Sequence, residues 1–238
     1  MRGSICRHWQ WEPGRSEGKS GGDVNKKDSI KAIRAMIDEG VNLVDTAPVY
    51  GNGHSEEVVG KALEDGYRDK VFLATKFSIS NDENGAIINN GSYENAIREC
   101  DDSLRRLKTD HIDIYIEAAP KVVWIDFLQP PYSMVEESQK NLLMWCEEQG
   151  IGTMTYGSLG AGILTGAVRE LPDWEENDFR YTFYDYFRDP KFSRIMELLT
   201  VLDQIALARQ KPLAQIAINW STQKSYVSTA ICGVRDPQ

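Results

Sequence analysis

The sequence lacks the marks of membrane-spanning, secreted and metal-stapled proteins. No window approaches eighteen consecutive apolar residues, and residues 1–8 are too polar for the apolar core of a signal peptide. The four cysteines, Cys6, Cys100, Cys146 and Cys232, lie far apart, so neither a disulfide framework nor a zinc knuckle is indicated. We therefore expect reduced, packed thiols in a cytoplasmic protein that has no membrane partner.

Positive charge is also scarce. The chain has 27 Lys and Arg against 36 Asp and Glu, which gives a net charge of -9 and a pI near 5.0. Proteins that grip nucleic acids or anionic lipids usually carry the opposite sign, so we expect no nucleic-acid partner and leave open a local basic pocket for one phosphate group. What the chain does have, 41% hydrophobic residues over 238 positions, suffices for the core of one domain spanning 1–238.

Helical patterns alternate with short apolar strands along the chain. Asp28 caps a run in which Ile30, Ile33 and Ile37 recur at helical spacing, and Gly40 ends that run. Strands that are nearly continuous apolar runs between helices indicate a parallel sheet covered by helices. The remaining predicted helices cover 55–63, 92–107, 136–149, 192–209 and 213–220, and the predicted strands cover 41–45, 71–76, 112–116, 126–129, 152–156 and 229–233.

Two of these helices have specific predicted core faces. One face of the helix over 92–107 carries Ile97, Cys100, Leu104 and Leu107. The inward residues of the long helix over 192–209 are expected to be Ile195, Leu198, Leu199, Leu202 and Ile205. Both faces follow the spacing of an amphipathic helix.

Two intervals depart from the regular alternation. Only nine residues separate Ile116 from Asp126, whereas a parallel crossover needs about a dozen or more, so a regular helix-bearing return does not fit there. The aromatic-rich stretch over 174–192 is either a surface loop or lid above a site, or a loop that packs on the outer helices. Polar residues end two successive strands, and in a barrel Asp45 and Lys76 would project from the same rim.

Several motifs then point to a known family. The chain reads GVNLVDTAPVYG over 40–51, SEEVVGKAL over 55–63, ATKF over 74–77, SLRRLKTDHIDIY over 103–115, LQPPYS over 128–133, GIGTMTYGSLGAGILTG over 150–166 and CGVRDP over 232–237. Together these motifs resemble those of the aldo-keto reductases and follow one another in the same order as in that family. The resemblance extends from about residue 28 onward. The resemblance implies an α/β fold of the (β/α)8 TIM-barrel type that binds NADPH and reduces aldehydes or ketones to alcohols. We expect this barrel to be incomplete, with one strand and two helices missing near 117–125 and a shortened C-terminus.

The resemblance implies three catalytic residues, Asp45, Tyr50 and Lys76. Hydride addition to a carbonyl leaves negative charge on oxygen, so a proton donor is needed, and Tyr50 can supply the proton. A nearby Lys76 ammonium favours the phenolate form, while Asp45 would hold the lysine charged and oriented. Taken singly, these residues have ordinary interpretations as a cap, a cover of the barrel mouth and a solvated strand-end charge; inside matched motifs the catalytic interpretation is favoured.

The family's fourth catalytic residue, a histidine, has no match. Its position falls on Ala118, and the adjacent Glu117 is out of register by one residue. For His8, His54 and His111, ordinary structural or solvent roles are favoured. The shortened interval also omits the Ser-Asn pair that holds the nicotinamide carboxamide in relatives.

Cofactor positions carry over in part. The resemblance places Gln129 at the nicotinamide amide, Tyr156 against the nicotinamide ring, and Gly157 and Leu159 along the pyrophosphate. Asp45 also belongs to this cofactor set. At the adenosine 2'-phosphate the matching residues are Gly233 and Arg235, and an arginine there would favour NADPH.

Two other hypotheses stay open at this stage. The chain could be a catalytically silent relative that still binds nucleotide or a protein. It could instead be a non-functional deletion fragment whose exposed strand edges pair with other chains. The sequence leaves the substrate and the oligomeric state undetermined.

Overall fold

The computed structural model describes residues 26–81, 87–117, 126–173 and 183–233. These residues form two compact units. The N-terminal unit consists of the described residues up to 117 together with Gly233, and the C-terminal unit consists of the described residues from 126 to 232. The expectation of one domain over 1–238 stays a prediction.

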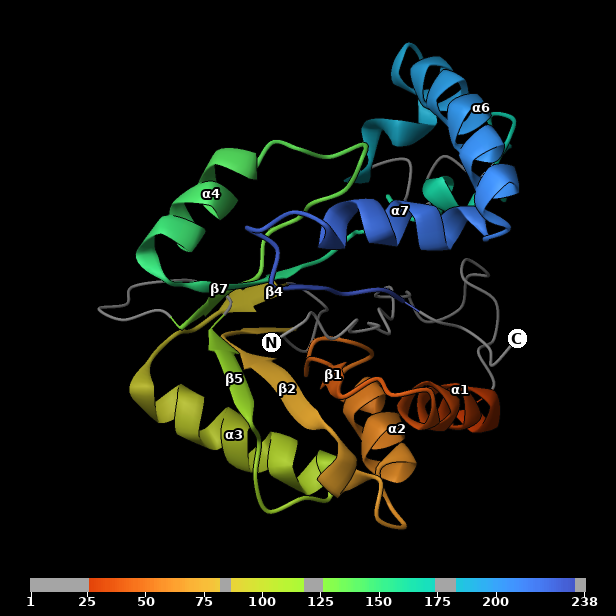
Figure 1. Ribbon diagram of the computed structural model, residues 1–238. Coiled ribbons are helices and arrows are strands. Elements are labelled where there is room, and N and C mark those ends of the chain that lie inside the picture. The colour runs from red at the N-terminus through yellow and green to blue at the C-terminus, as the bar shows by residue number, and fades with distance from the viewer. Residues whose placement is uncertain (1–25, 82–86, 118–125, 174–182, 234–238) are drawn as a thin grey trace. The chain divides into compact units, whose positions relative to one another are not determined.

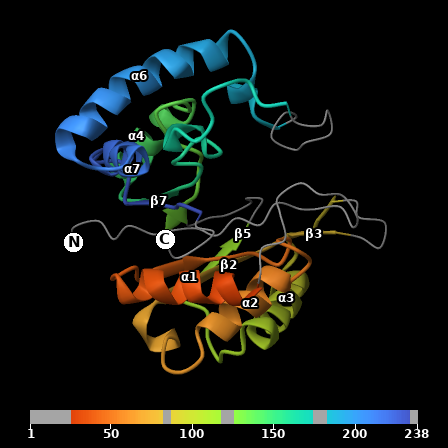
Figure 2. The ribbon, with the colours of Figure 1, turned by 90° about the vertical axis from the view of Figure 1, so that its right-hand side faces the viewer.

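The N-terminal unit is a parallel sheet with helices on one face, as the alternating pattern predicts (Figure 1). The sheet has the order β1-β2-β5, and Figure 2 shows the three helices packed along it. The elements are α1 (Lys26–Asp38), β1 (Leu43–Asp45), α2 (His54–Ala62), the 3-10 turn η1 (Arg68–Lys70), β2 (Phe72–Phe77), α3 (Tyr93–Leu107) and β5 (Ile114–Glu117).

The core of this unit lies between the helices and the sheet. Ile33 and Ile37 of α1 are buried, and Ile30 is partly buried, which confirms the predicted stripe. Val59 of α2 and Leu73 of β2 belong to the same apolar cluster. Burial of these side chains is the main favourable contribution to folding of the unit.

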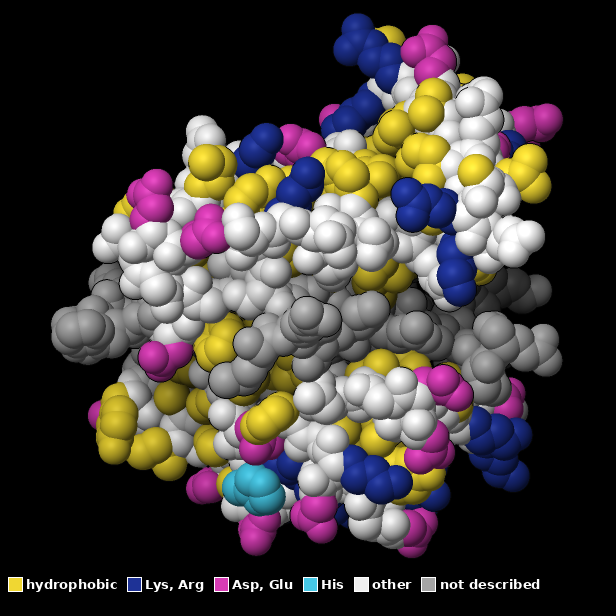
Figure 3. Space-filling model, viewed as in Figure 1, with side chains coloured by type: hydrophobic (Ala, Val, Ile, Leu, Met, Phe, Trp, Pro, Cys, Tyr) yellow, Lys and Arg dark blue, Asp and Glu magenta, His cyan; other side chains and the backbone are white. Residues whose placement is uncertain are grey.

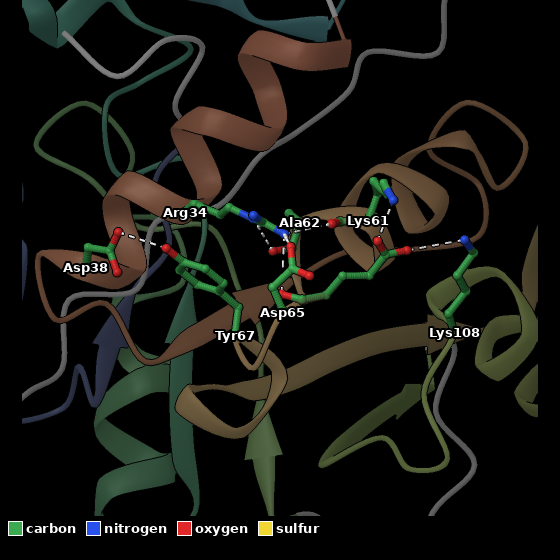
Figure 4. Close-up of polar contacts among 8 residues, drawn as sticks. Arg34, Asp38, Lys61, Ala62, Asp65, Tyr67 and Lys108 are labelled. Carbon is green, nitrogen blue, oxygen red and sulfur yellow. Dashed lines mark hydrogen bonds and ion pairs between the residues drawn. The ribbon is translucent and has the colours of Figure 1, made fainter.

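Polar contacts join α1 to the end of α2 (Figure 4). Arg34 Nε donates to the carbonyl of Ala62 at 2.9 Å, and Arg34 Nη2 donates to Asp65 Oδ2 at 2.9 Å. The guanidinium also lies 4.7 Å from the ring centroid of Tyr67, whose hydroxyl donates to Asp38 Oδ2 at 3.0 Å. Arg34 therefore occupies carbonyl groups that the last turn of α2 cannot satisfy within the helix.

The predicted core face of α3 is partly wrong. Leu107 is buried, but Ile97 is 48% exposed, and the other buried residues of α3 are Asn95, Glu99 and Ser103. These polar groups are paired: Asn95 Nδ2 donates to Glu99 Oε1 at 2.8 Å, and the other Glu99 oxygen accepts from the backbone N–H of Ser78 at 2.9 Å. A buried carboxylate with such donors satisfies its hydrogen-bonding capacity, so the helix turns this face inward.

A short hairpin follows β2 and was not predicted. Its antiparallel strands are β3 (Ile79–Asn81) and β4 (Ile87–Asn89). Three-residue strands are too short to show a clear alternation of apolar and polar residues, so the period that identifies strands in a sequence is missing.

The C-terminal unit contains a second parallel sheet, with the order β6-β7-β8. The predicted helix over 136–149 begins only at Lys140, because Ser133 and Glu136 pair with each other through two backbone hydrogen bonds of 2.9 and 3.1 Å. The elements are β6 (Phe127–Leu128), α4 (Lys140–Gln149), β7 (Gly152–Thr155), η2 (Ile163–Thr165), η3 (Asp185–Phe187), α6 (Lys191–Arg209), α7 (Leu213–Thr222) and β8 (Thr229–Ala230).

The core of the C-terminal unit joins α6, α7, η2 and η3. Tyr186 and Phe187 are buried in one cluster with the inner face of α6. The described end of the aromatic stretch, 183–192, therefore packs on the helices, while 174–182 lies outside the described residues. Leu198 is only partly buried and Ile205 is 40% exposed, so the predicted inward face of α6 is too wide.

Several apolar side chains of α6 are exposed. Figure 3 shows hydrophobic side chains over this helix, which carries the exposed Val201, Ile205 and Leu207. Within the ranges that the structure describes, no helix is long and apolar enough to cross a membrane.

The described parallel strands form two three-stranded sheets instead of one closed ring.

Candidate active site

Two neighbouring strands bring an acid and a base together in the N-terminal unit. Asp45 ends β1 and pairs in register with Ala74 of β2, and Lys76 lies two residues further along β2. Because side chains alternate along a strand, Ala74 and Lys76 point to the same face. The parallel register thus places both charged side chains at the same edge, as expected for strand ends in a barrel.

The two side chains form a buried ion pair. Lys76 Nζ donates to both Asp45 oxygens at 2.8 Å and to the carbonyl of Thr46 at 3.0 Å. The Asp45 side chain is fully buried and that of Lys76 is 14% exposed. These hydrogen bonds fix the orientation of the ammonium group.

Tyr50 is the third member of this group. It lies in the turns between β1 and α2, half-buried, and Lys76 Nζ is 5.2 Å from the centre of its ring. Burial by itself lowers the pKa of Lys76, but the negative charge of Asp45 and the interactions with Tyr50 outweigh it, so the pKa of Lys76 is raised above its usual value. The ammonium is therefore charged at neutral pH beside the phenol.

The structure thus brings Asp45, Tyr50 and Lys76 together, as the motifs predict; their catalytic roles stay a prediction. The arrangement offers a phenol as proton donor next to a fixed positive charge. Such a charge stabilises negative charge that develops on oxygen nearby.

No histidine among the described residues matches the fourth catalytic position that the resemblance implies. His54 Nδ1 lies 3.7 Å from Glu57 Oε2, and His111 Nδ1 lies 2.7 Å from Asp110 Oδ1, all on exposed side chains. Both histidines thus have surface partners, in keeping with the ordinary roles expected. The backbone of Glu117 pairs with Phe77 in β5, while His8 and Ala118 lie outside the described residues.

Most of the expected cofactor residues lie in the C-terminal unit. Gln129 and Tyr156 are half-buried, and Tyr156 is fixed next to Pro131 by a parallel bridge. Burial, with a smaller effect of the Glu136 charge, raises the pKa of the Tyr156 phenol. The ring therefore has no tendency to ionise near neutral pH.

The turn after Tyr156 is built from left-handed residues. Gly157 has φ 68°, and a Cβ added there would meet no atom within 4 Å. This backbone conformation favours glycine, and open space lies beside the chain. Leu159 is partly buried against the helical core, so its main chain is the part that suits a ligand contact. Gly233 is exposed, and Arg235 lies outside the described residues.

Sequence reasoning missed one buried charge beside the Asp45 site. Glu56 is fully buried; its carboxylate accepts from the Thr75 hydroxyl at 2.7 Å and pairs with Arg106 Nε at 2.5 Å. Acidic residues are common in the first turn of a helix because the helix dipole favours them, so Glu56 does not stand out by its position alone. Its spacing of three residues from the buried Val59 was the available signal, because residues three apart share a helix face.

The described part of the chain has no set of side chains that could bind a metal ion. Among these residues, no group of three or more His, Cys, Asp or Glu side chains is placed to hold a metal ion. Cys100 and Cys146 are free thiols.

A family sequence profile matches the chain in two pieces. The sequence profile of the Aldo/keto reductase family matches residues 10–124 and 116–238. The two matched pieces meet at 116–124, where the chain has too few residues for a regular crossover. The break in the match therefore supports an internal stretch of the family fold missing at this point.

Individual relatives show the same pattern. The chain is 31% identical to Aldo-keto reductase YhdN of Bacillus subtilis (strain 168) over 258 residues, covering 91% of this chain and 77% of the relative. It is 28% identical over 244 residues to Aldo-keto reductase yakc, whose name carries the label NADP(+), of Schizosaccharomyces pombe, covering 84% of this chain and 72% of the relative.

A solved structure shows the fold. The glycerol dehydrogenase AKR11B4 from Gluconobacter oxydans superposes with a TM-score of 0.81 at 26% identity, covering 98% of this chain and 83% of that chain. The fold is therefore of the TIM-barrel type, and the shorter length agrees with an incomplete barrel. From the profile match, the identity and the superposition together, the chain belongs to the aldo/keto reductase family.

Proposed function

We propose that this protein reduces an aldehyde or ketone to an alcohol with NADPH. The observation that carries the proposal is the buried Asp45–Lys76 pair with Tyr50 beside the ammonium. In this group the Tyr50 phenol is the proton donor, and the Lys76 ammonium beside it is a positive charge that Asp45 holds in place.

Each residue of the group has a distinct part in the proposal. Tyr50 donates its hydroxyl proton to the carbonyl oxygen of the substrate as negative charge develops there. Lys76 stabilises the phenolate that remains, because its pKa is raised and it stays charged. Asp45 holds the ammonium in place through two 2.8 Å bonds. When bound, NADPH supplies the hydride.

The C-terminal unit has features that fit this cofactor. The half-buried ring of Tyr156 presents a flat apolar surface, and the open main chain at Gly157 allows close approach of a phosphate group. We propose that these two residues, with Gln129 and the main chain of Leu159, hold NADPH. Asp45, Gly233 and Arg235 complete the proposed set.

The experiment is an NADPH-consumption assay with a generic aromatic aldehyde. We expect slow turnover in the wild type, because the missing imidazole removes acid–base assistance of roughly 10² to 10⁴. Tyr50→Phe should abolish it. The matched control is Tyr115→Phe, which removes another half-buried hydroxyl of the same unit, one that donates to the Ala96 carbonyl at 3.0 Å.

The other outcomes separate the competing hypotheses. NADPH fluorescence that changes on binding without turnover would identify a silent nucleotide-binding relative. A protein that shows no NADPH binding and no turnover, and whose thermal unfolding is poorly cooperative, would be identified as a deletion fragment. Turnover that survives Tyr50→Phe would overturn the assigned proton donor, and equal rates with NADH would overturn the preference for NADPH.

A further inference from the structure

A set of buried polar side chains surrounds the segment that carries Tyr50. Thr46, Ser55, Glu56 and Thr75 are each at most 1% exposed. Buried polar groups cost free energy unless they are paired, and all four are paired with one another or with a neighbouring element. We call these four residues, together with Lys76, the polar ring.

The ring closes through alternating hydrogen bonds and peptide bonds. The hydroxyls of Thr46 and Ser55 are 2.9 Å apart, and Ser55 is joined to Glu56 by a peptide bond. Glu56 Oε1 accepts from the Thr75 hydroxyl at 2.7 Å. Thr75 is joined to Lys76, whose ammonium donates back to the Thr46 carbonyl at 3.0 Å. The ring thus starts at the Thr46 hydroxyl and returns, through Lys76, to the Thr46 carbonyl.

Tyr50 lies inside the segment that the ring closes. The backbone N–H of Ser55 donates to the Tyr50 carbonyl at 3.2 Å, and that of Gly53 donates to the Pro48 carbonyl at 2.7 Å. Ser55 therefore bonds to the first residue of the segment with its side chain and to Tyr50 with its backbone. The start of α2 and the position of Tyr50 are set together.

Glu56 joins this segment to the sheet. Thr75 and Lys76 are adjacent in β2, so their side chains point to opposite faces, Thr75 toward the helices and Lys76 toward Asp45. The bond between Glu56 and Thr75 ties the start of α2 to the end of β2 from the helical face. Arg106 of α3 fixes the carboxylate by an ion pair, and its side chain packs where a Cβ on Gly53 would lie, 2.5 Å away.

We infer that Glu56 and Thr75 are positioning residues that set the Tyr50 phenol against the Lys76 ammonium. Their role in turnover rests on the proposed function, whereas their effect on the phenol rests on the hydrogen bonds alone. Glu56 and Thr75 act through the backbone of the neighbouring residues, Ser55 and Lys76.

The test compares Thr75→Val, which removes the hydroxyl at nearly constant volume, with Thr75→Ser, which keeps it. We expect Thr75→Val to lower kcat about 10- to 100-fold, because small displacements of a reacting group have effects of this order. KM should stay within about twofold, since substrate binding is not the affected step. Thr75→Ser should restore most of kcat, and Glu56→Gln should lower kcat in the same direction.

Thr153→Val is the matched control. Thr153 is likewise a buried strand threonine, and its hydroxyl donates to the Tyr226 carbonyl at 2.8 Å in the other unit. The second measurement needs no turnover: the ultraviolet titration of the Tyr50 phenol, obtained as each protein minus its Tyr50→Phe counterpart. In Thr75→Val its midpoint should rise toward that of Lys76→Met, because a displaced ammonium stabilises the phenolate less.

The two measurements separate the inference from the proposed function. An inactive wild type whose phenol titration still shifts in Thr75→Val would refute the proposed function and support the positioning role. If kcat and the titration in Thr75→Val match those in Thr153→Val, the positioning role is overturned. A kcat loss that Thr75→Ser fails to restore would likewise overturn it.

Discussion

At the scale of single residues, the site depends on charges that leave water together. Asp45 is fully buried and Lys76 nearly so, and burial alone would lower the pKa of the lysine. The Asp45 carboxylate and the interactions with Tyr50 together more than offset this cost, so the pKa of Lys76 is raised in the folded protein. The same contacts that keep the ammonium charged therefore also stabilise the fold.

This linkage predicts a specific pH dependence for Lys76→Met. A lysine whose folded pKa lies above its unfolded value of about 10.4 contributes stability that is complete below that pH and lost as the pH rises through the folded pKa. At neutral pH, Lys76→Met should lower the free energy of unfolding by about 3–5 kcal/mol, because Asp45 stays buried without its partner. Urea unfolding at several pH values measures the difference from wild type.

The difference should shrink at alkaline pH. Lys140→Met is the control, since Lys140 and Glu137 form a pair 3.7 Å apart on side chains exposed to 46% and 43%. Exposed pairs of this kind contribute little, so this variant should stay close to wild type throughout. A Lys76→Met difference that stays constant as the pH rises from about 10 to about 12 would contradict the linkage.

Residue identity was predictable where a motif carries it. Asp45 and Lys76 were expected at one rim because each ends a short apolar strand, and Tyr50 was expected from the resemblance to the aldo-keto reductases. The structure brings the three residues together. The partner of Glu56 was not predictable, because Arg106 lies fifty positions away along the chain. Only packing of α3 against α2 makes that pair.

At the scale of elements, α2 and α3 approach so closely that one position requires glycine. A Cβ on Gly60 of α2 would lie 2.6 Å from the carbonyl oxygen of Leu107, the last residue of α3. The blocking atoms belong to the backbone and cannot rotate away. Glycine in mid-helix is therefore explained by contact, although it disfavours the helix by about 1 kcal/mol relative to alanine.

Gly60→Ala should accordingly destabilise the N-terminal unit in spite of the better helix former. Overpacking typically costs about 1–3 kcal/mol, and the loss should appear in thermal or urea unfolding. Gly152→Ala is the control, because its Cβ would meet the ring of Phe127, a side chain that is 46% exposed and free to rotate. If Gly60→Ala is as stable as wild type, the close approach of the helices is wrong.

The elements themselves were predicted better than their faces. The helices with strong periodicity, α1 and α6, match the predicted spans within a few residues. Errors arose where side chains make specific contacts: Glu99 turns a polar face of α3 inward, and Ser133 pairs with Glu136 ahead of α4. Hydrophobic periodicity contains no information on these hydrogen bonds.

At the scale of the whole molecule, each unit has its own apolar cluster. Leu73 belongs to the cluster of the N-terminal unit and Leu199 to that of the C-terminal unit, and both side chains are fully buried. The sequence predicts a single domain, and in the TIM-barrel fold of the family all strands share one core. Cooperative unfolding is the property that this prediction requires.

Leu73→Ala and Leu199→Ala test the prediction. Each should lower the free energy of unfolding by about 2–5 kcal/mol through lost burial and a cavity. Each should also shift one common transition and reduce hydrogen-exchange protection across both units. Val201→Ala, at a position on α6 that is 54% exposed, should change little. Two separate transitions, each sensitive to one variant, would show that the units unfold as separate domains.

The sequence by itself determined the family, the α/β class and the three candidate site residues Asp45, Tyr50 and Lys76. These depend on local motifs and on periodicities that need no partner. The tertiary structure decided which polar groups are buried: Glu56 lies inside because Thr75 and Arg106 meet it there, and Ile97 lies outside because Glu99 occupies the inner face of α3. Burial of a polar group requires partners from distant parts of the chain, and only the fold brings them together.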